Sequence, residues 1–332
     1  MITHIEISGF KSFQNLSIDL RPFQVLIGPN GVGKSNLFDA ISLLSDLADN
    51  NTLYDAFRKN RGEVNELFSI SDDVQDNTMR TMSFAVEMLI AKTVTDALGV
   101  TADVTSSRLR YELTIQLRKD KDSGFQRMYV VHESLDAITE RKDKWYKKHI
   151  PSSHRTSWIV RNRRGAYIST ESGTIYKHQD GRQGRKQETP IGQIERTILS
   201  TINSTEYPTA YAVRQEMLNW KFLQLNPLEL RTPSHIYDPD ELTQDGSNLA
   251  AVLHRLANEN EFALKDVSLD MANLVPGILE ISVKPSRERE EFLIEATSVD
   301  GSKFSSRILS DGTLRLLTLV TLRNDPKHFG LL

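Results

Sequence analysis

Residues Gly28 to Ser35 read GPNGVGKS and fit the pattern G-x-x-x-x-G-K-[ST]. The apolar run Phe23-Gln24-Val25-Leu26-Ile27 comes before them and is long enough for a buried strand. The residues from Asn36 to Leu44 follow, with Leu37, Ile41 and Leu44 at helical spacing. A strand, a glycine-rich turn and a helix in this order form the setting in which the pattern binds phosphate.

The residue types in this loop suit a polyphosphate. Glycines let backbone N–H groups approach the ligand without Cβ clashes, and the start of a helix favours an anion. Lys34 would reach the β- and γ-phosphates, and the Ser35 hydroxyl would help to hold Mg²⁺. The plain alternative is an ordinary glycine turn. The flanking elements favour a nucleotide site.

The composition bounds the class of protein. The chain has 332 residues, 39% of them hydrophobic, which suits a globular protein of one large or two ordinary domains. It holds no cysteine, so disulfides, thiolate metal sites and cysteine nucleophiles are excluded. The N-terminus alternates like a strand rather than a signal peptide, and no apolar run is long enough for a membrane span. We expect a cytoplasmic protein without membrane association.

The net charge of −3 conceals a basic block. Between Arg141 and Lys186 there are 13 Lys/Arg against 3 Asp/Glu. Aromatic residues are interleaved with these cations: Trp145, Tyr146, Trp158, Tyr167 and Tyr176. Cations for phosphates and aromatic faces for bases are typical of a nucleic-acid surface. The alternative is a solvated hairpin whose aromatic residues pack on one another.

The first half of the chain reads mainly as strands. Strands are expected at 2–7, 16–20, 79–91, 108–117 and 125–132, the last three in an antiparallel sheet, with short strand-like pieces at 158–160, 166–168 and 174–176. Residues 46–71 read as largely helical, with Leu53, Ala56 and Phe57 as a packing face, and 72–77 as a loop. Residues 94–100 fit either helix or strand.

The second half reads as helices and a strand pair. Helices are expected at 191–220 with Ile191, Ile194, Ile198 and Ile202 on one face, from Ser247 as N-cap through Leu256, and at 261–274. Strands are expected at 222–225, 278–283 and 291–297. The stretch Leu309 to Arg315, LSDGTLR, then opens an apolar helix, and its hydroxyl and glycine suit an anion. The plain alternative is an N-capped helix.

Three motifs occur in one order: GFKSF at Gly9 to Phe13, GPNGVGKS at Gly28, and LSDGTLR at Leu309. In this order they resemble the ATP-binding heads of SMC/RecF-like ABC-type ATPases, and in particular bacterial AAA-family ATPases with a compact insertion. The resemblance implies an α/β fold of the P-loop NTPase class, an ABC-type ATPase head with an antiparallel β lobe and an α+β insertion. It implies three parts: a head part with the phosphate loop (1–95), an insertion (96–235) and a signature-helix part (236–332).

The resemblance also implies the roles of individual residues. In such ATPases two heads enclose two ATP molecules, and the phosphate loop of one copy faces the signature turn of the other. Expected to bind ATP and Mg²⁺ in their own copy are Gly28, Asn30, Gly31, Gly33, Lys34 and Ser35, with Lys11 and Ser12 nearby. Ser310 and Gly312 would touch the γ-phosphate of the partner's ATP, with Arg315 a weaker candidate. A homodimer is therefore expected.

One part of the family pattern is missing. Such ATPases continue with an apolar strand ending in Asp-Glu, the Walker B strand, which supplies the Mg²⁺ carboxylate and the base. The chain stops at His328 to Leu332, where that strand would begin, and Ile236 to Pro239 is a poor substitute. No catalytic base can be named, and Gln75 is one guess for the glutamine that senses Mg²⁺. The expectation is an N-terminal portion of a longer ATPase, or half of a split one.

Three functions remain open at this point. The first is an ATPase whose head closure acts on DNA, in repair, recombination or phage defence, with the basic block Arg141 to Lys186 as the DNA contact. The second is a hydrolysis-deficient ATP-sensing scaffold or regulatory subunit for an effector such as a nuclease or toxin. The third, a subunit of a membrane transporter, fits the SDGT and GFKSF sequences less well.

Overall fold

The computed structural model describes residues 1–49, 51–69, 79–120, 124–162, 165–181, 186–191, 194–260 and 262–327. The described residues form two compact units, Met1–Trp220 and Lys221–Lys327. Within the described ranges, no helix is both long and apolar enough to span a bilayer. The three-part division expected from the sequence stays a prediction.

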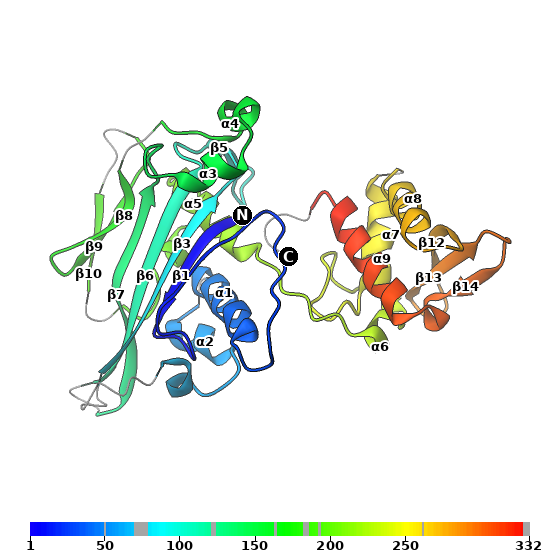
Figure 1. Ribbon diagram of the computed structural model, residues 1–332, viewed down its shortest axis with the longest axis horizontal. Coiled ribbons are helices and arrows are strands. Elements are labelled where there is room, and N and C mark those ends of the chain that lie inside the picture. Colours follow the sequence, from blue (N-terminus) through cyan, green and yellow to red (C-terminus); the bar gives the residue numbers. More distant parts are fainter. Residues whose placement is uncertain are drawn as a thin grey trace. The chain divides into compact units, whose positions relative to one another are not determined.

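The first unit is built on an eight-stranded antiparallel sheet of order β10-β9-β8-β7-β6-β3-β1-β2 (Figure 1). Its strands are β1 (Ile2–Ser8), β2 (Leu16–Asp19), β3 (Met79–Leu89), β6 (Arg108–Lys119), β7 (Gln126–Ala137), β8 (Ala166–Glu171), β9 (Thr174–His178) and β10 (Lys186–Pro190). A separate hairpin pairs β4 (Thr93–Thr95) with β5 (Thr101–Asp103). The expected strands at 2–7, 16–20, 79–91, 108–117 and 125–132 are confirmed.

Buried and partly exposed side chains alternate along the strands, and this alternation shows which face of the sheet is buried. On β6 the odd-numbered residues from Leu109 to Leu117 are buried, while Arg110 and the even-numbered residues after it remain partly exposed. An antiparallel sheet with one wet face has this pattern. The unit's helices and 3₁₀ turns are α1 (Lys34–Ala48), α2 (Leu53–Arg58), η1 (Val64–Leu67), α3 (Lys144–His149), α4 (Ser152–Trp158), η2 (Leu199–Thr201) and α5 (Pro208–Leu218).

Helix α1 follows the phosphate loop as the sequence predicts. Its buried face includes Leu37, Ile41 and Leu44, and each such side chain contributes about 1.5–3 kcal/mol when taken out of water. The predicted packing face of α2 is also confirmed, since Leu53 and Phe57 are both buried. The prediction that residues 46–71 are largely helical is right for the end of α1, for α2 and for η1, but irregular chain separates these three pieces. The loop expected at 72–77 lies outside the described residues.

The buried strand expected at Phe23 to Ile27 is wrong. This segment belongs to no strand, and the side chains of Phe23 and Ile27 are 82% and 91% exposed. A strand needs a neighbour for its backbone N–H and C=O groups. Within the described residues the sheet ends at β2, and no strand pairs with this segment. Apolar composition alone therefore did not produce a strand.

The continuous helix expected at 191–220 is also wrong. Ile194, Ile198 and Ile202 are buried, but they lie on irregular chain around η2. The Glu133 carboxylate accepts the N–H groups of Ile198 and Leu199. A regular helix then restarts at Pro208, whose missing N–H is tolerated in a first turn.

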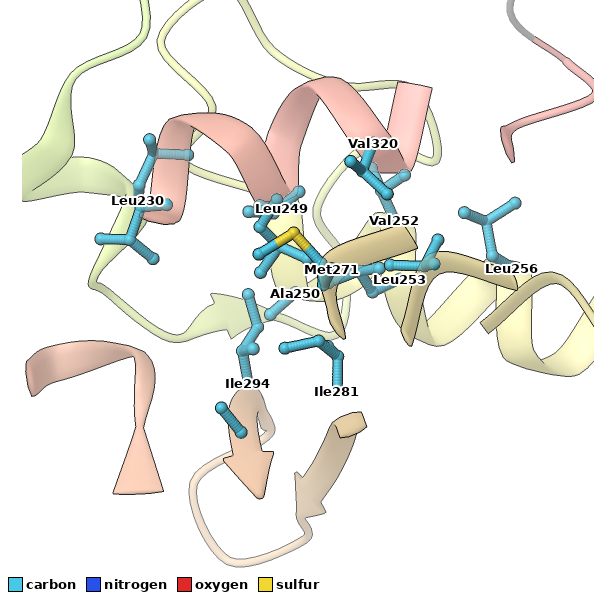
Figure 2. Close-up of a cluster of buried hydrophobic side chains, with 14 of the residues drawn as sticks. Leu230, Leu249, Ala250, Val252, Leu253, Leu256, Met271, Ile281, Ile294 and Val320 are labelled. Atoms are coloured by element: carbon cyan, nitrogen blue, oxygen red, sulfur yellow. The ribbon is translucent and has the colours of Figure 1, made fainter. Parts of the chain in front are cut away.

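The second unit packs helices on a small antiparallel sheet. Its elements are α6 (Pro227–Leu230), β11 (Ser234–His235), α7 (Leu249–Glu259), α8 (Ala263–Leu274), β12 (Ile278–Ser286), β13 (Glu291–Ser298), β14 (Lys303–Ser305), η3 (Ser306–Ile308) and α9 (Asp311–Asn324). Figure 2 shows side chains of α7, α8, β12, β13 and α9 in one core, among them Leu253, Met271, Ile281, Ile294 and Val320. This core supports the start of α9.

Most sequence predictions hold in the second unit, with two corrections. The helix at 261–274 and the strands at 278–283 and 291–297 are confirmed by α8, β12 and β13. The strand expected at 222–225 is absent from this described stretch, where Gln224 N–H bonds the Gln244 carbonyl instead. The cap of α7 is Asn248 rather than Ser247, and the Asn248 side chain binds the Thr243 N–H.

Candidate functional site

The phosphate loop meets α1 at Gly33. This residue has φ 98°, a left-handed conformation that favours glycine, and no side chain caps the helix. The first helical hydrogen bond runs from the Leu37 N–H to the Gly33 carbonyl. The N–H groups at the start of α1 precede that bond and carry the positive end of the helix dipole. This part of the loop therefore offers donors to an anion.

Lys34 places a cation inside the same loop. Its Nζ donates to the carbonyls of Gly28 and Pro29, both at 2.7 Å. Asn30, Gly31 and Ser35 are exposed around it. Because carbonyl oxygens are weaker partners than phosphate oxygens, the ammonium can exchange them for a ligand without leaving the loop.

The GFKSF turn lies directly against the phosphate loop. A Cβ on Gly33 would come within 3.1 Å of the Phe13 ring and 3.2 Å of the Ser12 hydroxyl oxygen. The Asn36 amide on α1 donates to that same hydroxyl at 2.8 Å. Proximity of this turn to the loop, expected from the resemblance, is therefore observed. The roles of Lys11 and Ser12 toward a nucleotide stay predictions.

Asp39 on α1 holds two cations near this turn. Its carboxylate binds Lys11 Nζ at 2.7 Å and Arg61 Nη2 at 2.9 Å. Lys11 and Asp39 side chains are mostly buried, whereas Arg61 is exposed. Sequence reasoning missed Asp39 and Arg61, because Lys11 and Asp39 are 28 positions apart and no local spacing pairs them.

The donor set of the loop fits a Mg²⁺-bound triphosphate. Uncapped N–H groups and Lys34 suit phosphate oxygens, and the exposed Ser35 hydroxyl in the first turn of α1 suits Mg²⁺. In the described ranges, no cluster of three or more His, Asp or Glu side chains could hold a metal ion by itself.

The second candidate site, the LSDGTLR turn, lies in the other unit. Ser310 is the N-cap of α9, and its Oγ accepts the Thr313 N–H at 3.2 Å. The Ser310 hydroxyl also bonds the Thr313 hydroxyl at 2.8 Å. Ser310, Asp311, Gly312 and Arg315 are exposed, so the turn can be reached from solvent. Helix α9 confirms the predicted apolar helix after this turn.

The basic block differs from its predicted form. Trp145, Tyr146 and Tyr167 are buried, so they offer no faces for stacking bases. Residues 158–160 are the end of α4 and irregular chain, while β8 and β9 confirm the other two strand-like pieces. The exposed Trp158 stacks on His154. Most of these aromatic side chains therefore pack within the protein and do not form a surface on which bases could stack.

Five exposed cations of the block lie on α3 and the turn before it. We call these five residues the α3 patch: Arg141, Lys142, Lys144, Lys147 and Lys148. Asp143 holds the helix to the sheet by accepting the Tyr146 N–H and the buried Arg108 guanidinium at 2.8 Å. Trp145 and Tyr146 therefore face inward, and the cations face solvent.

A family model described as AAA ATPase domain matches residues 1–200. The chain belongs to the AAA ATPase domain family. This AAA ATPase domain has the P-loop NTPase fold of the α/β class with a mostly antiparallel sheet, as the sequence predicts. ATPase domains of this family bind ATP.

Two relatives of this AAA ATPase domain match over short stretches. The chromosome partition protein Smc of Methanocaldococcus jannaschii is 55% identical over 38 residues, 11% of this chain and 3% of that protein. The DNA replication and repair protein RecF of Parasynechococcus marenigrum is 50% identical over 40 residues, 12% of this chain and 11% of that protein. The matches thus span a small fraction of the relatives' lengths. Over these short stretches the chain is similar to an SMC protein and to a RecF protein, in line with the resemblance that the three motifs predict.

Two solved structures are similar over 97% of the chain. One is the Smc head bound to the C-winged helix domain of ScpA, at 15% identity, 76% coverage of that chain and TM-score 0.42. The other is the Smc head domain of Pyrococcus furiosus with an extended coiled coil, bound to the C-terminal domain of ScpA, at 14% identity, 78% coverage and TM-score 0.41.

The structure brings the predicted nucleotide residues of the first unit together. Lys11, Ser12 and the loop from Gly28 to Ser35 all lie around the start of α1. Ser310 and Gly312 lie together in the second unit. Gln75 and His328 to Leu332 lie outside the described residues. Ile236 and Tyr237 are exposed after the two-residue strand β11, which is unlike a buried Walker B strand.

Proposed function

We propose that this AAA ATPase domain binds Mg²⁺·ATP at the start of α1 and pairs with a second copy around the nucleotide. The observation that carries the proposal is the uncapped helix start at Gly33 with Lys34 folded into the loop before it. Loop N–H groups and Lys34 bind the phosphates, Ser35 holds Mg²⁺, and Lys11 and Ser12 lie beside them. Bound Mg²⁺ compensates the phosphate charge.

In this proposal the second copy supplies the Ser310 turn. Ser310 and Gly312 are exposed at the start of α9, where the helix dipole favours a γ-phosphate. Two such contacts form in a symmetric dimer, because each copy gives one phosphate loop and one Ser310 turn. ATP is then the contact that holds the copies together.

A pair of variants tests this arrangement. Lys34→Ala removes the loop cation, so it should abolish ATP binding, measured by titration calorimetry. Ser310→Arg should leave ATP binding intact but prevent ATP-dependent dimerisation, measured by sedimentation, because a long side chain then fills the contact with the partner's phosphate. Equal loss of ATP binding in both variants would contradict the two-copy arrangement.

ATP hydrolysis also requires chemical groups that the starts of α1 and α9 do not supply. Phosphoryl transfer depends on positioning and charge compensation, and a water nucleophile needs a base. We propose that the exposed segment Phe23 to Ile27 pairs with a strand supplied from outside the described residues, and that this strand brings the carboxylates. The family match is to an ATPase domain and does not favour the hydrolysis-deficient scaffold. An effector partner and a role in phage defence stay predictions.

The proposed nucleic-acid contact is the α3 patch. The relatives are named for chromosome partition and for DNA replication and repair. Five exposed cations that neutralise about five phosphates give a log–log slope of affinity against salt near −4.5 on duplex DNA. Replacing Lys144, Lys147 and Lys148 by Gln should reduce that slope by about 3 units. A salt response that is flat, or unchanged in this variant, would remove the α3 patch from the proposal.

A further inference from the structure

Arg231 binds the turn that precedes α9, although it lies 80 positions before Asp311. It follows α6 directly, and its Nη2 donates to the Leu309 carbonyl at 3.0 Å and to the Asp311 carboxylate. Its other terminal nitrogen donates to the Pro227 carbonyl at 2.9 Å. One guanidinium therefore joins the first residue of α6 to residues on both sides of Ser310.

The backbone of Arg231 holds the same turn from its other end. The Arg231 carbonyl accepts the Ser306 hydroxyl at 3.1 Å, and Ser306 is buried. The Leu309 N–H in turn bonds the Ser306 carbonyl at 3.2 Å. Residues 306–311 are thus fixed at both ends by a single residue. The planar fork of arginine suits such a multiple contact better than lysine would.

Asp311 creates an electrostatic problem for a phosphate site. Its side chain is 61% exposed and follows Ser310 immediately. A triphosphate that approached the Ser310 hydroxyl would meet a carboxylate of the same sign, and like charges at a contact oppose binding. The paired guanidinium of Arg231 offsets that charge. Arg307 and Arg315 are exposed cations nearby, but Arg231 is the one that this structure shows bound to Asp311.

We propose that Arg231 makes the Ser310 turn competent to receive the partner's ATP, by fixing the turn and by neutralising Asp311. The inference rests on the proposed function, because it concerns the same contact between two copies. Arg231 is a positioning residue here: it acts through Leu309 and Asp311 rather than on the nucleotide.

The test compares dimer dissociation constants with Mg²⁺·ATP present, measured by sedimentation. Arg231→Gln should weaken the dimer about tenfold, and adding Asp311→Asn should restore it to within about threefold, because the uncompensated charge is then gone. ATP binding in the phosphate loop should be unchanged in both variants. Arg307→Gln removes the same charge from an exposed side chain and is the matched control, with less than a twofold expected effect.

Each outcome decides the proposal. If Arg231→Gln dimerises as tightly as the wild type, the proposal is wrong. If adding Asp311→Asn does not restore the weakened dimer, Arg231 does not act by compensating the charge of Asp311, and the proposal as stated is wrong. Asp311→Asn alone changes only an exposed side chain, so it keeps the test valid should Arg231→Gln unfold. That variant should dimerise at least as tightly as the wild type, and a weaker dimer counts against the inference. If Ser310→Arg also dimerises normally, the proposed function itself fails.

Discussion

The starts of α1 and α9, which the proposed function assigns to the same kind of anion, are built differently. At α1 the cap is Gly33 in a left-handed conformation, which provides no side-chain cap, and a lysine lies in the loop. At α9 the cap is Ser310, whose hydroxyl already accepts an N–H, and a carboxylate follows it. The first is open and cationic, and the second is capped and neutralised by Arg231.

The difference indicates separate roles. An uncapped start with its own cation can bind a polyphosphate alone, since donors and charge come from one loop. At α9 the N-cap hydroxyl is already hydrogen-bonded within its own helix, so this helix start has fewer free groups for an anion. We therefore expect it to contact a phosphate that the phosphate loop of the other copy already holds. We therefore expect changes at α1 to affect ATP affinity and changes at α9 to affect dimerisation.

After Lys34→Ala, the largest expected loss of ATP affinity comes from Gly33→Ala. The new Cβ would lie 3.1 Å from the Phe13 ring, and φ 98° is strained for alanine. The loop must shift, and the N–H groups lose their alignment. ATP binding measured by calorimetry should weaken about 100-fold, or about 2.7 kcal/mol. An ATP affinity within threefold of the wild-type value would show that phosphate binding by the loop does not depend on the left-handed conformation of Gly33.

A prediction about folding stability, separate from ATP affinity, concerns the packing that supports α1 and depends on pH. Glu133 on β7 is fully buried, and burial raises the pKa of its carboxyl from 4.5 to about 7, against the opposing hydrogen bonds from Ile198, Leu199 and Tyr111. The neighbouring Thr197 hydroxyl binds the Leu47 carbonyl near the end of α1 at 2.8 Å. Glu133 thus helps to fix the chain that holds α1.

Because the folded-state pKa is raised, the folded protein keeps a proton that the unfolded chain loses between pH 4.5 and about 7. This contribution to stability is fully present below pH 4.5 and is lost as the pH rises through about 7. Urea unfolding of the wild type should show a fall of up to about 3 kcal/mol across that window. Glu133→Gln should flatten this dependence. An equal slope in the variant would assign the effect to other groups.

A smaller effect is expected from Asp39→Asn. Lys11 and Arg61 lose the carboxylate that fixes their head groups beside the loop, so ATP affinity should fall about fivefold, or about 1 kcal/mol. Asp46→Asn is the matched control, because Asp46 lies on the same helix but binds Lys59 at 2.9 Å instead. Unchanged or tighter ATP binding in Asp39→Asn would show that the carboxylate does not position these cations for the nucleotide.

The smallest expected effect is at the cap of α9. Ser310→Ala removes the acceptor of the Thr313 N–H and should cost about 1 kcal/mol of unfolding free energy, whereas Ser310→Gly should cost only a few tenths. ATP binding by a single copy should not change in either variant. Chemical denaturation and calorimetry measure the two quantities. A loss of ATP affinity would contradict the separation of roles between α1 and α9.

The sequence predicts those features whose interacting residues are close together along the chain, and it misses those whose residues are far apart. The phosphate loop, α1 and the cap at Ser310 depend on neighbours within a few positions, so spacing alone predicts them. The pairs Lys11–Asp39 and Arg231–Asp311 join distant segments, and only the fold reveals them. The strand expected at Phe23 to Ile27 failed for a related reason, because a strand is defined by its neighbour. The aromatic residues around α3 look the same in sequence whether they face solvent or the core.

The most direct test of the central claim is a mixing experiment. Lys34→Ala and Ser310→Arg copies should each fail to dimerise with Mg²⁺·ATP, yet an equimolar mixture should form a heterodimer by sedimentation. That heterodimer joins the intact phosphate loop of the Ser310→Arg copy to the intact Ser310 turn of the Lys34→Ala copy, and it should bind one ATP. A mixture that stays monomeric, or a Lys34→Ala copy that dimerises by itself with ATP, would contradict the account.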